Sequence, residues 1–307
     1  MNGPMIMILG VTASGKGRLA FELARRLDAE IVSVDSMKVY RRMDVGTAKP
    51  SVEARRQVRH HMIDIVEPSE SFSAGLFLER ASAAIEEIRG RGRPVVAVGG
   101  TALYSKALLY GLFEGPGSDE RIRRELRSRV ESDGPAALHR ELCGIDPAAA
   151  DRISPNDAKR IIRALEVHRL TGKPISSLQR QFDASEPVEK WTIIGLRRDK
   201  TVESGRINAR VKRMVQMGLV EEVRSLLAES EPLSPQARCA IGYAEVIEHV
   251  EGRLSLDDAV ERIKKNTRRL AKGQRTWFRR FSDVAWIDAG PDEPPESVVE
   301  RAMRRLG

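Results

Sequence analysis

A glycine-rich stretch near the start of the chain has the residue types that bind a phosphate group. Residues 10–17 read Gly-Val-Thr-Ala-Ser-Gly-Lys-Gly and match the pattern G-x-x-x-x-G-K-[ST] at every position except the last. The glycines let backbone N–H groups turn toward an anion, and Lys16 supplies a mobile ammonium for the outer phosphates. The last position is normally a hydroxyl residue that ligates Mg²⁺ or a phosphate oxygen, and here it is Gly17. We therefore expect a phosphate-binding loop that lacks one hydroxyl, with a glycine turn that binds nothing as the alternative.

Two further polar residues follow apolar runs of the chain. Asp35 follows the run 30–34, and Thr101 follows the run 94–98 and a pair of glycines. Because ligands bind at the carboxyl ends of strands in open α/β sheets, we expect both residues near the glycine-rich loop. Asp35 is then a base or a metal-linked carboxylate, unless it only caps a helix or closes a turn. The glycine pair is either a second anion site or a sign of tight strand–helix packing.

The segments that position these residues alternate between apolar runs and amphipathic stretches. The predicted strands are 5–9, 30–34, 94–98 and 191–196, and the predicted helices include 18–27, 71–88 and 203–217. This alternation indicates an α/β fold, a P-loop NTPase-like core with a parallel sheet flanked by helices. Residues 118–186 read as polar and helical after a Gly-Pro-Gly-Ser linker. We predict a core formed by 1–117 and 187–307 and an all-helical insertion domain, 118–186.

One face of the predicted helix 203–217 carries three arginines. Arg206, Arg210 and Arg213 follow a spacing of i, i+4, i+7. Guanidinium groups bind phosphate oxygens in pairs, so this face could clamp a diphosphate. The alternative is ordinary surface charge.

The strongest local signal for nucleic-acid binding is the stretch 262–280, which contains no acidic residue. Lysine and arginine neutralise phosphates and release counterions. Leu270, Trp277, Phe278 and Phe281 are interleaved with the basic residues. Aromatic residues at helical spacing are more often core anchors than stacking platforms. We expect them to pack inward and the basic residues to face RNA.

A second basic group lies on a predicted helix that begins at Asp157. Lys159, Arg160 and Arg163 surround its apolar side, which is typical of a solvated face and also of an RNA-binding face. The formal net charge of +8 permits a polyanionic partner without proving one.

Composition limits the class of protein. The chain has 307 residues, 41% of them hydrophobic, and no apolar run near the roughly 18 to 20 residues of a membrane span. We find no signal peptide and expect a cytoplasmic monomer. Cys143 and Cys239 suit neither a disulfide framework nor a zinc site, and we expect both to be small buried residues. The adjacent His60 and His61 are poor joint ligands for zinc.

Eleven short motifs, in order and over essentially the whole chain, resemble one family, the tRNA dimethylallyltransferases (tRNA isopentenyltransferases). Each motif alone is weak, whereas their order and spacing together are specific. The matching stretches are 10–17, 33–36, 39–40, 46–50, 60–64, 99–101, 154–157, 160–166, 171–174, 240–243 and 274–278.

The resemblance implies a reaction, a cofactor and two partners. Members of the family transfer a dimethylallyl group from dimethylallyl diphosphate to N6 of adenosine 37, beside the anticodon, in tRNAs that read codons starting with U. The partners implied are dimethylallyl diphosphate and the anticodon stem-loop of tRNA, and the cofactor implied is Mg²⁺, bound through the diphosphate.

The resemblance also implies roles for particular residues. Asp35 would be the general base, with Thr101 and Lys16 beside it in the catalytic site. The diphosphate would be bound by Gly10, Thr12, Ala13, Ser14, Gly15, Lys16, Gly17, Arg206 and Arg210. The tRNA would be bound by Asp35, Ser36, Met37, Lys38, Thr101, Arg123, Lys159, Arg160, Ile161, Ile162 and Arg163.

The chain departs from the family pattern at Val11, Gly17, Lys38, Ala102 and Gly273, where the family usually has Pro, Thr, Gln, Gly and Arg. Gly17 removes a hydroxyl, and a salt bridge from Lys38 to Asp35 would blunt the base. Two other hypotheses therefore stay open. One is a catalytically impaired tRNA-binding paralogue. The other is a P-loop small-molecule kinase that binds ATP, for which the helical insertion and the basic stretch are surplus.

Overall fold

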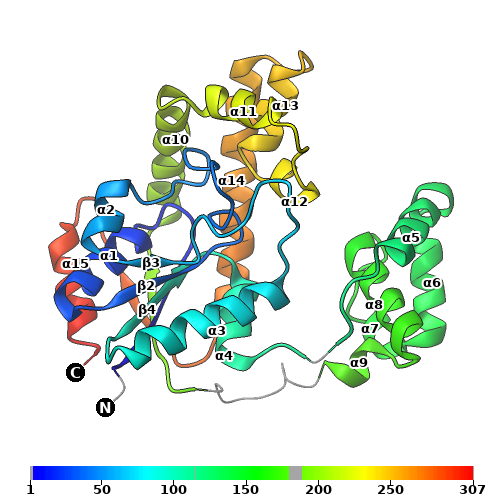
Figure 1. Cartoon of the computed structure of the whole chain (residues 1–307), viewed down its shortest axis with the longest axis horizontal. Coiled ribbons are helices and arrows are strands. Elements are labelled where there is room, and N and C mark those ends of the chain that lie inside the picture. Colours follow the sequence, from blue (N-terminus) through cyan, green and yellow to red (C-terminus); the bar gives the residue numbers. More distant parts are fainter. Residues whose placement is uncertain (1–2, 114, 180–188, 307) are drawn as a thin grey trace. The chain divides into compact units, whose positions relative to one another are not determined.

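The computed structural model describes residues 3–113, 115–179 and 189–306. The chain divides into two compact units (Figure 1): unit 1 comprises Met1–Leu109 and Glu189–Gly307, and unit 2 comprises Tyr110–Val188. The predicted insertion, 118–186, ends outside the described residues, and so does the predicted return to the core at 187.

Unit 1 contains a six-stranded parallel sheet, which confirms the predicted α/β class. Its strand order is β3-β2-β4-β1-β5-β6. The strands are β1 (Met5–Gly10), β2 (Glu30–Val34), β3 (His60–His61), β4 (Val95–Gly99), β5 (Thr192–Arg197) and β6 (Ala285–Asp288). Every residue of β1 and β2 is buried, as expected for parallel strands that are covered on both faces. The edge strands β3 and β6 were not predicted.

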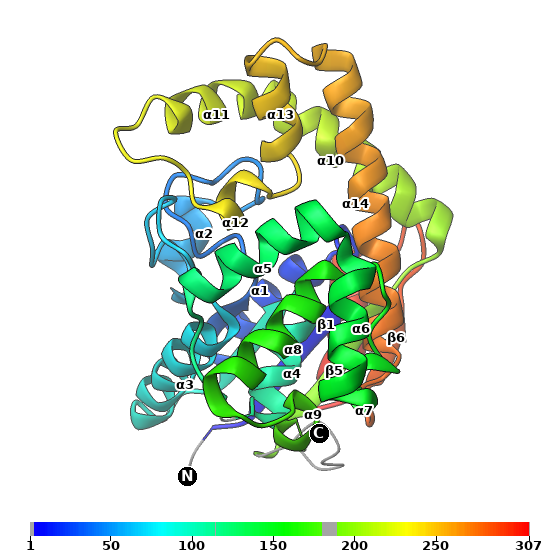
Figure 2. The same cartoon turned by 90° about the vertical axis from the view of Figure 1, so that its right-hand side faces the viewer.

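The helices of unit 1 form two groups. The first group comprises α1 (Lys16–Leu27), α2 (Val52–Gln57), α3 (Ala74–Gly90), α4 (Ala102–Tyr110) and α15 (Pro295–Met303). The second group gathers at one end of the sheet (Figures 1 and 2) and comprises α10 (Lys200–Gln216), α11 (Leu219–Leu227), α12 (Pro235–Arg238), α13 (Tyr243–Val250) and α14 (Leu256–Phe278). We call this second group the helical cap. The sequence predicted a helix at α10 and a basic stretch where α14 lies, but not the assembly of these helices into one body.

Unit 2, as far as it is described, is entirely helical. Its helices are α5 (Glu120–Asp133), α6 (Pro135–Ile145), α7 (Pro147–Ala150), α8 (Ala158–Thr171) and α9 (Ile175–Leu178). The side chains of Asp119 and Asp157 cap α5 and α8 by accepting backbone N–H groups of the first turn. Leu126, Leu138 and Leu165 belong to a separate hydrophobic core. Unit 2 therefore has the core of an independent domain.

One expectation from composition is wrong. Cys143 and Cys239 are exposed, not buried. Cys143 lies on the outer side of α6, and Cys239 follows the short helix α12. Across the described part of the chain, no helix combines the length and apolarity that crossing a membrane requires.

Candidate active site

A cavity of about 1170 Å³ lies in unit 1 and collects most of the predicted site residues. The loop after β1, the turns after β2 and β4, and the helices α10 and α14 all contribute to its wall. The predicted site residues that line it are Thr12, Ala13, Gly15, Lys16, Gly17, Asp35, Ser36, Met37, Lys38, Thr101, Arg206 and Arg210. Asp35 and Thr101 thus lie in the same cavity as the glycine-rich loop, as expected from the carboxyl ends of their strands.

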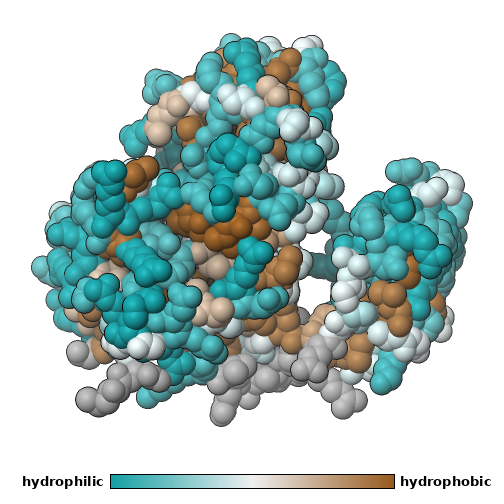
Figure 3. Space-filling model, viewed as in Figure 1, coloured by the Kyte–Doolittle hydropathy of each residue, from teal (hydrophilic) through white to brown (hydrophobic). Residues whose placement is uncertain are grey.

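Part of the cavity wall is apolar. Met214, Ile241, Ile263 and Leu270 line it, all of them from the helical cap or its connections. Figure 3 shows a brown patch on unit 1 below the helices α11 to α14, in a surface that is mainly teal. The cavity therefore offers both charged and hydrocarbon-like surroundings.

The glycine-rich loop has the curved backbone of a phosphate-binding loop. Ala13 and Gly15 both have positive φ values, 63° and 100°. Two predicted diphosphate ligands, Gly10 and Ser14, do not line the cavity. The Ser14 hydroxyl is buried under the loop, where a Cβ at Gly10 would come within 2.8 Å of it. This hydroxyl has no hydrogen-bond partner among the described residues.

Three arginines hold three consecutive residues of this loop. Arg210 donates from Nη2 to the Thr12 hydroxyl at 2.7 Å. Arg206 donates from Nε to the carbonyl of the next residue, Ala13, at 2.8 Å. Arg198, which was not predicted, donates from Nε to the Ser14 carbonyl at 2.8 Å. The arginine face of α10 therefore fastens the loop as well as lining the cavity.

Gln274, on α14, joins the two glycine turns of the site. Its Oε1 accepts the Thr12 N–H at 2.8 Å, and its Nε2 donates to the Gly100 carbonyl at 2.8 Å. It is 7% exposed, so solvent cannot replace these bonds. The sequence analysis missed this role. The available signal was its spacing, because Gln274 lies on the same helical face as the buried Phe278.

Asp35 closes a turn and also lines the cavity. Its Oδ1 accepts the backbone N–H groups of Met37 at 2.9 Å and Lys38 at 3.3 Å. The Thr101 hydroxyl accepts the Ser36 N–H at 3.0 Å, which ties the turn after β2 to the turn after β4. The suspected salt bridge does not form, since no ion pair joins Lys38 to Asp35 among the described residues.

The cavity gathers positive charge. The pKa of Lys16 is lowered to about 7, chiefly by burial and also by the charges of Lys38 and Arg210, while the charge of Asp35 opposes this shift. Burial likewise lowers the pKa of Lys38 and of Arg210. The Lys16 ammonium donates to the Val11 carbonyl at 3.2 Å. A bound anion would stabilise the charged forms of cations that are shielded from solvent in this way.

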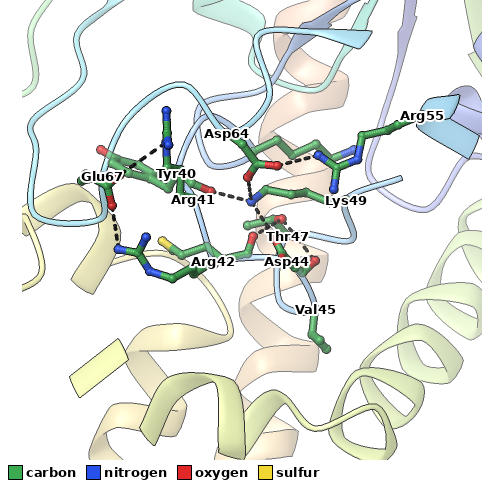
Figure 4. A network of polar contacts seen from close by, with 12 residues as sticks. Tyr40, Arg41, Arg42, Asp44, Val45, Thr47, Lys49, Arg55, Asp64 and Glu67 are labelled. Carbon is green, nitrogen blue, oxygen red and sulfur yellow. Dashed lines mark hydrogen bonds and ion pairs between the residues drawn. The ribbon is translucent and has the colours of Figure 1, made fainter. Parts of the chain in front are cut away.

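The loop that carries Lys38 is fixed by a buried lysine further along it. The Lys49 side chain is 2% exposed, and its Nζ donates to the Tyr40 carbonyl, Asp44 Oδ1 and Asp64 Oδ1, each at 2.5 Å (Figure 4). Arg55 binds the other oxygen of Asp64 at 2.5 Å. All three donors of the ammonium are thus used. This lysine is structural.

The same loop is also bound by the helical cap. The Glu222 carboxylate, on α11, accepts the backbone N–H groups of Asp44, Val45 and Gly46 at 2.9, 2.8 and 3.2 Å. The Tyr243 hydroxyl donates to Glu222 Oε1 at 2.6 Å. A Cβ at Gly46 would lie 2.4 Å from the Tyr243 ring, so only glycine fits there.

The adjacent histidines have a structural explanation. His61 Nε2 lies 2.6 Å from Oε2 of the buried Glu30, and Arg91 binds both oxygens of that carboxylate. Burial would raise the pKa of Glu30, but these hydrogen bonds lower it on balance. Within the described ranges, no group of three or more His, Cys, Asp or Glu side chains could hold a metal ion.

The residues of unit 2 that were predicted to bind tRNA fall into three groups by their burial and contacts. Arg123 and Arg163 both bind the fully buried Glu166 carboxylate, at 2.9 and 2.8 Å. Ile161 and Ile162 belong to the hydrophobic core, so their side chains are buried, and their role in tRNA binding stays a prediction. The remaining two residues, Lys159 and Arg160, are exposed.

The basic stretch on α14 is arranged largely as expected. Phe278 and Phe281 are buried, and Trp277 lines the cavity with the Arg280 guanidinium 5.7 Å from its ring centroid. Leu270, which is interleaved with these aromatic residues, is 43% exposed. The exposed basic residues are Arg262, Lys265, Arg269, Lys272, Arg279 and Arg280.

The residues around the loop do not fit a magnesium ion ligated by a loop side chain. Gly17 has no side chain, the Thr12 hydroxyl is engaged by Arg210, and the Ser14 hydroxyl lies under the loop. Mg²⁺ prefers oxygen ligands and is held at such loops by a Ser or Thr hydroxyl. The Mg²⁺ implied by the resemblance therefore stays a prediction.

Comparison with known proteins identifies the family. A family model described as IPP transferase matches residues 38–281. A tRNA dimethylallyltransferase from Geobacter metallireducens is 48% identical over 284 residues, 92% of each chain. A tRNA isopentenylpyrophosphate transferase of known structure from Bacillus halodurans is 40% identical, with a TM-score of 0.71 over 99% of this chain and 96% of that one. A eukaryotic dimethylallyltransferase acting on tRNA is 25% identical, with a TM-score of 0.79 over 99% of this chain and 80% of that one. The chain belongs to the IPP transferase family.

Proposed function

We propose that this chain transfers a dimethylallyl group from dimethylallyl diphosphate to N6 of adenosine 37 in tRNAs that read codons starting with U. The observation that carries the proposal is the set of side chains that line one cavity. It combines a carboxylate, Asp35, with the cations of the phosphate-binding loop and α10 and with an apolar wall. A base, an anion site and a hydrocarbon site are the three elements that this reaction requires.

The carboxylate has the chemistry of the required base. An exocyclic amine on an aromatic ring is a poor nucleophile, so its proton must be removed as the new bond forms. N6 attacks the allylic carbon, the carbon–oxygen bond to the diphosphate breaks with its electron pair on oxygen, and the proton passes to Asp35. Because two backbone N–H groups hold its Oδ1, the carboxylate keeps a fixed direction in the cavity.

The leaving group gains negative charge as the allylic carbon gains positive charge. Lys16, Arg206 and Arg210 line the cavity at the loop and offer cationic donors to the departing diphosphate. Preorganised donors are the main source of such stabilisation, and the bonds from Arg206 and Arg210 to the loop keep these side chains in place.

The partner proposed for the basic surface is the anticodon stem-loop of tRNA. Lys159 and Arg160 on α8 and the exposed basic residues of α14 are available to phosphates, because the structure leaves them exposed. The target adenine must also leave its stack to reach a cavity of this kind. We further propose that the chain acts as a monomer in the cytoplasm.

The test is a nucleoside analysis. The protein is incubated with dimethylallyl diphosphate and a tRNA that has adenosine at position 37, and the digested nucleosides are weighed. We expect isopentenyladenosine with the wild type, much less with Asp35→Asn, and none with a tRNA that has guanosine at position 37. Absence of the product with enzyme in excess over tRNA would refute transfer and favour the tRNA-binding paralogue. Phosphoryl transfer from ATP without RNA would favour the kinase.

A further inference from the structure

Lys38 is an ammonium without a partner in the wall of the cavity. It lines the cavity together with Lys16, Asp35 and Arg210, and its side chain is partly buried. Its Nζ makes no hydrogen bond and no ion pair in the part of the chain that the structure describes. Charged groups shielded from water are normally paired. An unpaired lysine at this place therefore points to an anionic ligand.

The position of Lys38 is fixed by its backbone. Its N–H donates to Asp35 Oδ1 at 3.3 Å, and its carbonyl accepts the Asp64 N–H at 3.2 Å. Asp64 is in turn held by Lys49 and Arg55 (Figure 4). The ammonium is thus presented to the cavity from a rigid segment, which is what a binding residue needs.

The space at Gly17 is open on the same cavity wall. A Cβ at Gly17 would meet nothing within 4 Å, so a Ser or Thr would fit there without strain. The chain instead leaves the loop with no hydroxyl that could hold a metal ion. A divalent ion held there would bring positive charge to the phosphates, and the Lys38 ammonium brings positive charge to the same cavity.

We propose that Lys38 binds the diphosphate directly and replaces the positive charge that a metal ion held at position 17 would provide. This inference rests on the proposed function and names the residue that adapts the site to Gly17. Lys38 is then a catalytic residue that acts on the leaving group beside Lys16. The charges around it agree with this role. Burial and Arg210 lower its pKa while Asp35 raises it, so a polyanion would relieve the repulsion.

The test measures binding of inorganic pyrophosphate by isothermal titration calorimetry, once with EDTA and once with Mg²⁺. The variants are Lys38→Gln, Lys38→Met, Gly17→Thr and the double variant Gly17→Thr/Lys38→Gln. Lys212→Gln is the matched control, because Lys212 is exposed on α10 and does not line the cavity. It removes the same charge without removing a contact.

We expect the wild type to bind pyrophosphate in EDTA and both Lys38 variants to bind it about tenfold or more weakly, as for loss of a charge-assisted hydrogen bond. The control should change affinity by less than about twofold. Gly17→Thr should have little effect alone, but in the double variant it should restore affinity only when Mg²⁺ is present. Because Lys38 has no partner to lose, its variants should unfold no more easily than the wild type.

Two results would overturn the proposal. One is a pyrophosphate affinity in EDTA that is the same for the Lys38 variants as for the wild type. The other comes from a separate titration with tRNA: weaker binding of tRNA by the Lys38 variants without weaker binding of pyrophosphate, which would assign Lys38 to an RNA phosphate. The pyrophosphate titration needs neither tRNA nor turnover. It therefore tests Lys38 even if the nucleoside analysis shows no transfer, and the two failures remain distinguishable.

Discussion

Replacing Lys16 by methionine should stabilise the fold of unit 1 while it destroys the anion site. Lys16 is the partly buried first residue of α1, and among the described residues its Nζ donates to the Val11 carbonyl alone. No carboxylate lies within ion-pair distance of it among the described residues. The helix N-terminus is also an unfavourable place for a cation. Burial is the largest cause that lowers the pKa of Lys16 from 10.5 to about 7.

The size of the effect follows from these two pKa values. At about 1.4 kcal/mol per pH unit, the difference between 10.5 and about 7 corresponds to about 5 kcal/mol as an upper limit. Below pH 7 the amine is protonated in both the folded and the unfolded chain, so the full penalty acts. Between about pH 7 and 10.5 the unfolded chain keeps a proton that the folded chain has released, and stability therefore rises with pH.

The assay is urea unfolding of wild type and Lys16→Met at pH 6 and pH 9, followed by tryptophan fluorescence. All three tryptophans, Trp191, Trp277 and Trp286, lie in unit 1, so the signal reports that unit. We expect the variant to be more stable by a few kcal/mol at pH 6. Its advantage should shrink by about 3 kcal/mol at pH 9, the stability that the wild type regains over two pH units.

A matched control variant and two refuting outcomes define this test. Lys212→Met removes an exposed lysine of α10, so its stability relative to the wild type should not change between the two pH values. If Lys16→Met were less stable than the wild type at pH 6, Lys16 would not be a desolvated, unpaired cation. A stability difference that does not depend on pH would refute the reasoning equally.

Three further predictions follow from individual contacts. Gln274→Ala should lower kcat/KM for prenyl transfer by about 10- to 100-fold, because it releases the loop from the turn after β4, and steady-state kinetics would show this. Lys159→Ala and Arg160→Ala should each reduce the slope of log affinity for tRNA against log salt by about 1, with unchanged thermal unfolding. Arg123→Ala should destabilise unit 2 by about 3 kcal/mol, since it leaves the buried Glu166 carboxylate partly unpaired, and calorimetric unfolding would measure this.

The parts of the fold and site that the sequence predicts are those with local signals. The glycine-rich loop, Asp35 and Thr101 each follow a buried run of five or six residues, and parallel strands bring their carboxyl ends to one edge. The edge strands were missed because β3 has two residues and β6 has four, too few for a recognisable period.

Long-range contacts explain what could not be predicted. Gln274 lies 262 residues from Thr12 and 174 from Gly100, and nothing in its neighbourhood shows that its amide will join them. The same holds for Arg123 and Arg163, which look like RNA ligands in a basic helical segment. Only the folded chain shows that the buried Glu166 takes both of them. The charge pattern of a sequence gives the number of cationic side chains, but it does not show how many of them pair with buried carboxylates in the folded protein.

The cavity also shows why affinity for the diphosphate and stability of the fold with an empty cavity oppose each other in this chain. Lys16 and Lys38 have lowered pKa values because burial and like charges disfavour their protonated forms. A bound diphosphate would supply the missing counter-charge, so its binding should take up protons above pH 7 and stabilise the folded state in proportion to its concentration. An exposed lysine would not strain the fold but would also bind the diphosphate weakly, because water screens it. The unpaired charge that destabilises the empty cavity is therefore the charge that gives it affinity for the substrate.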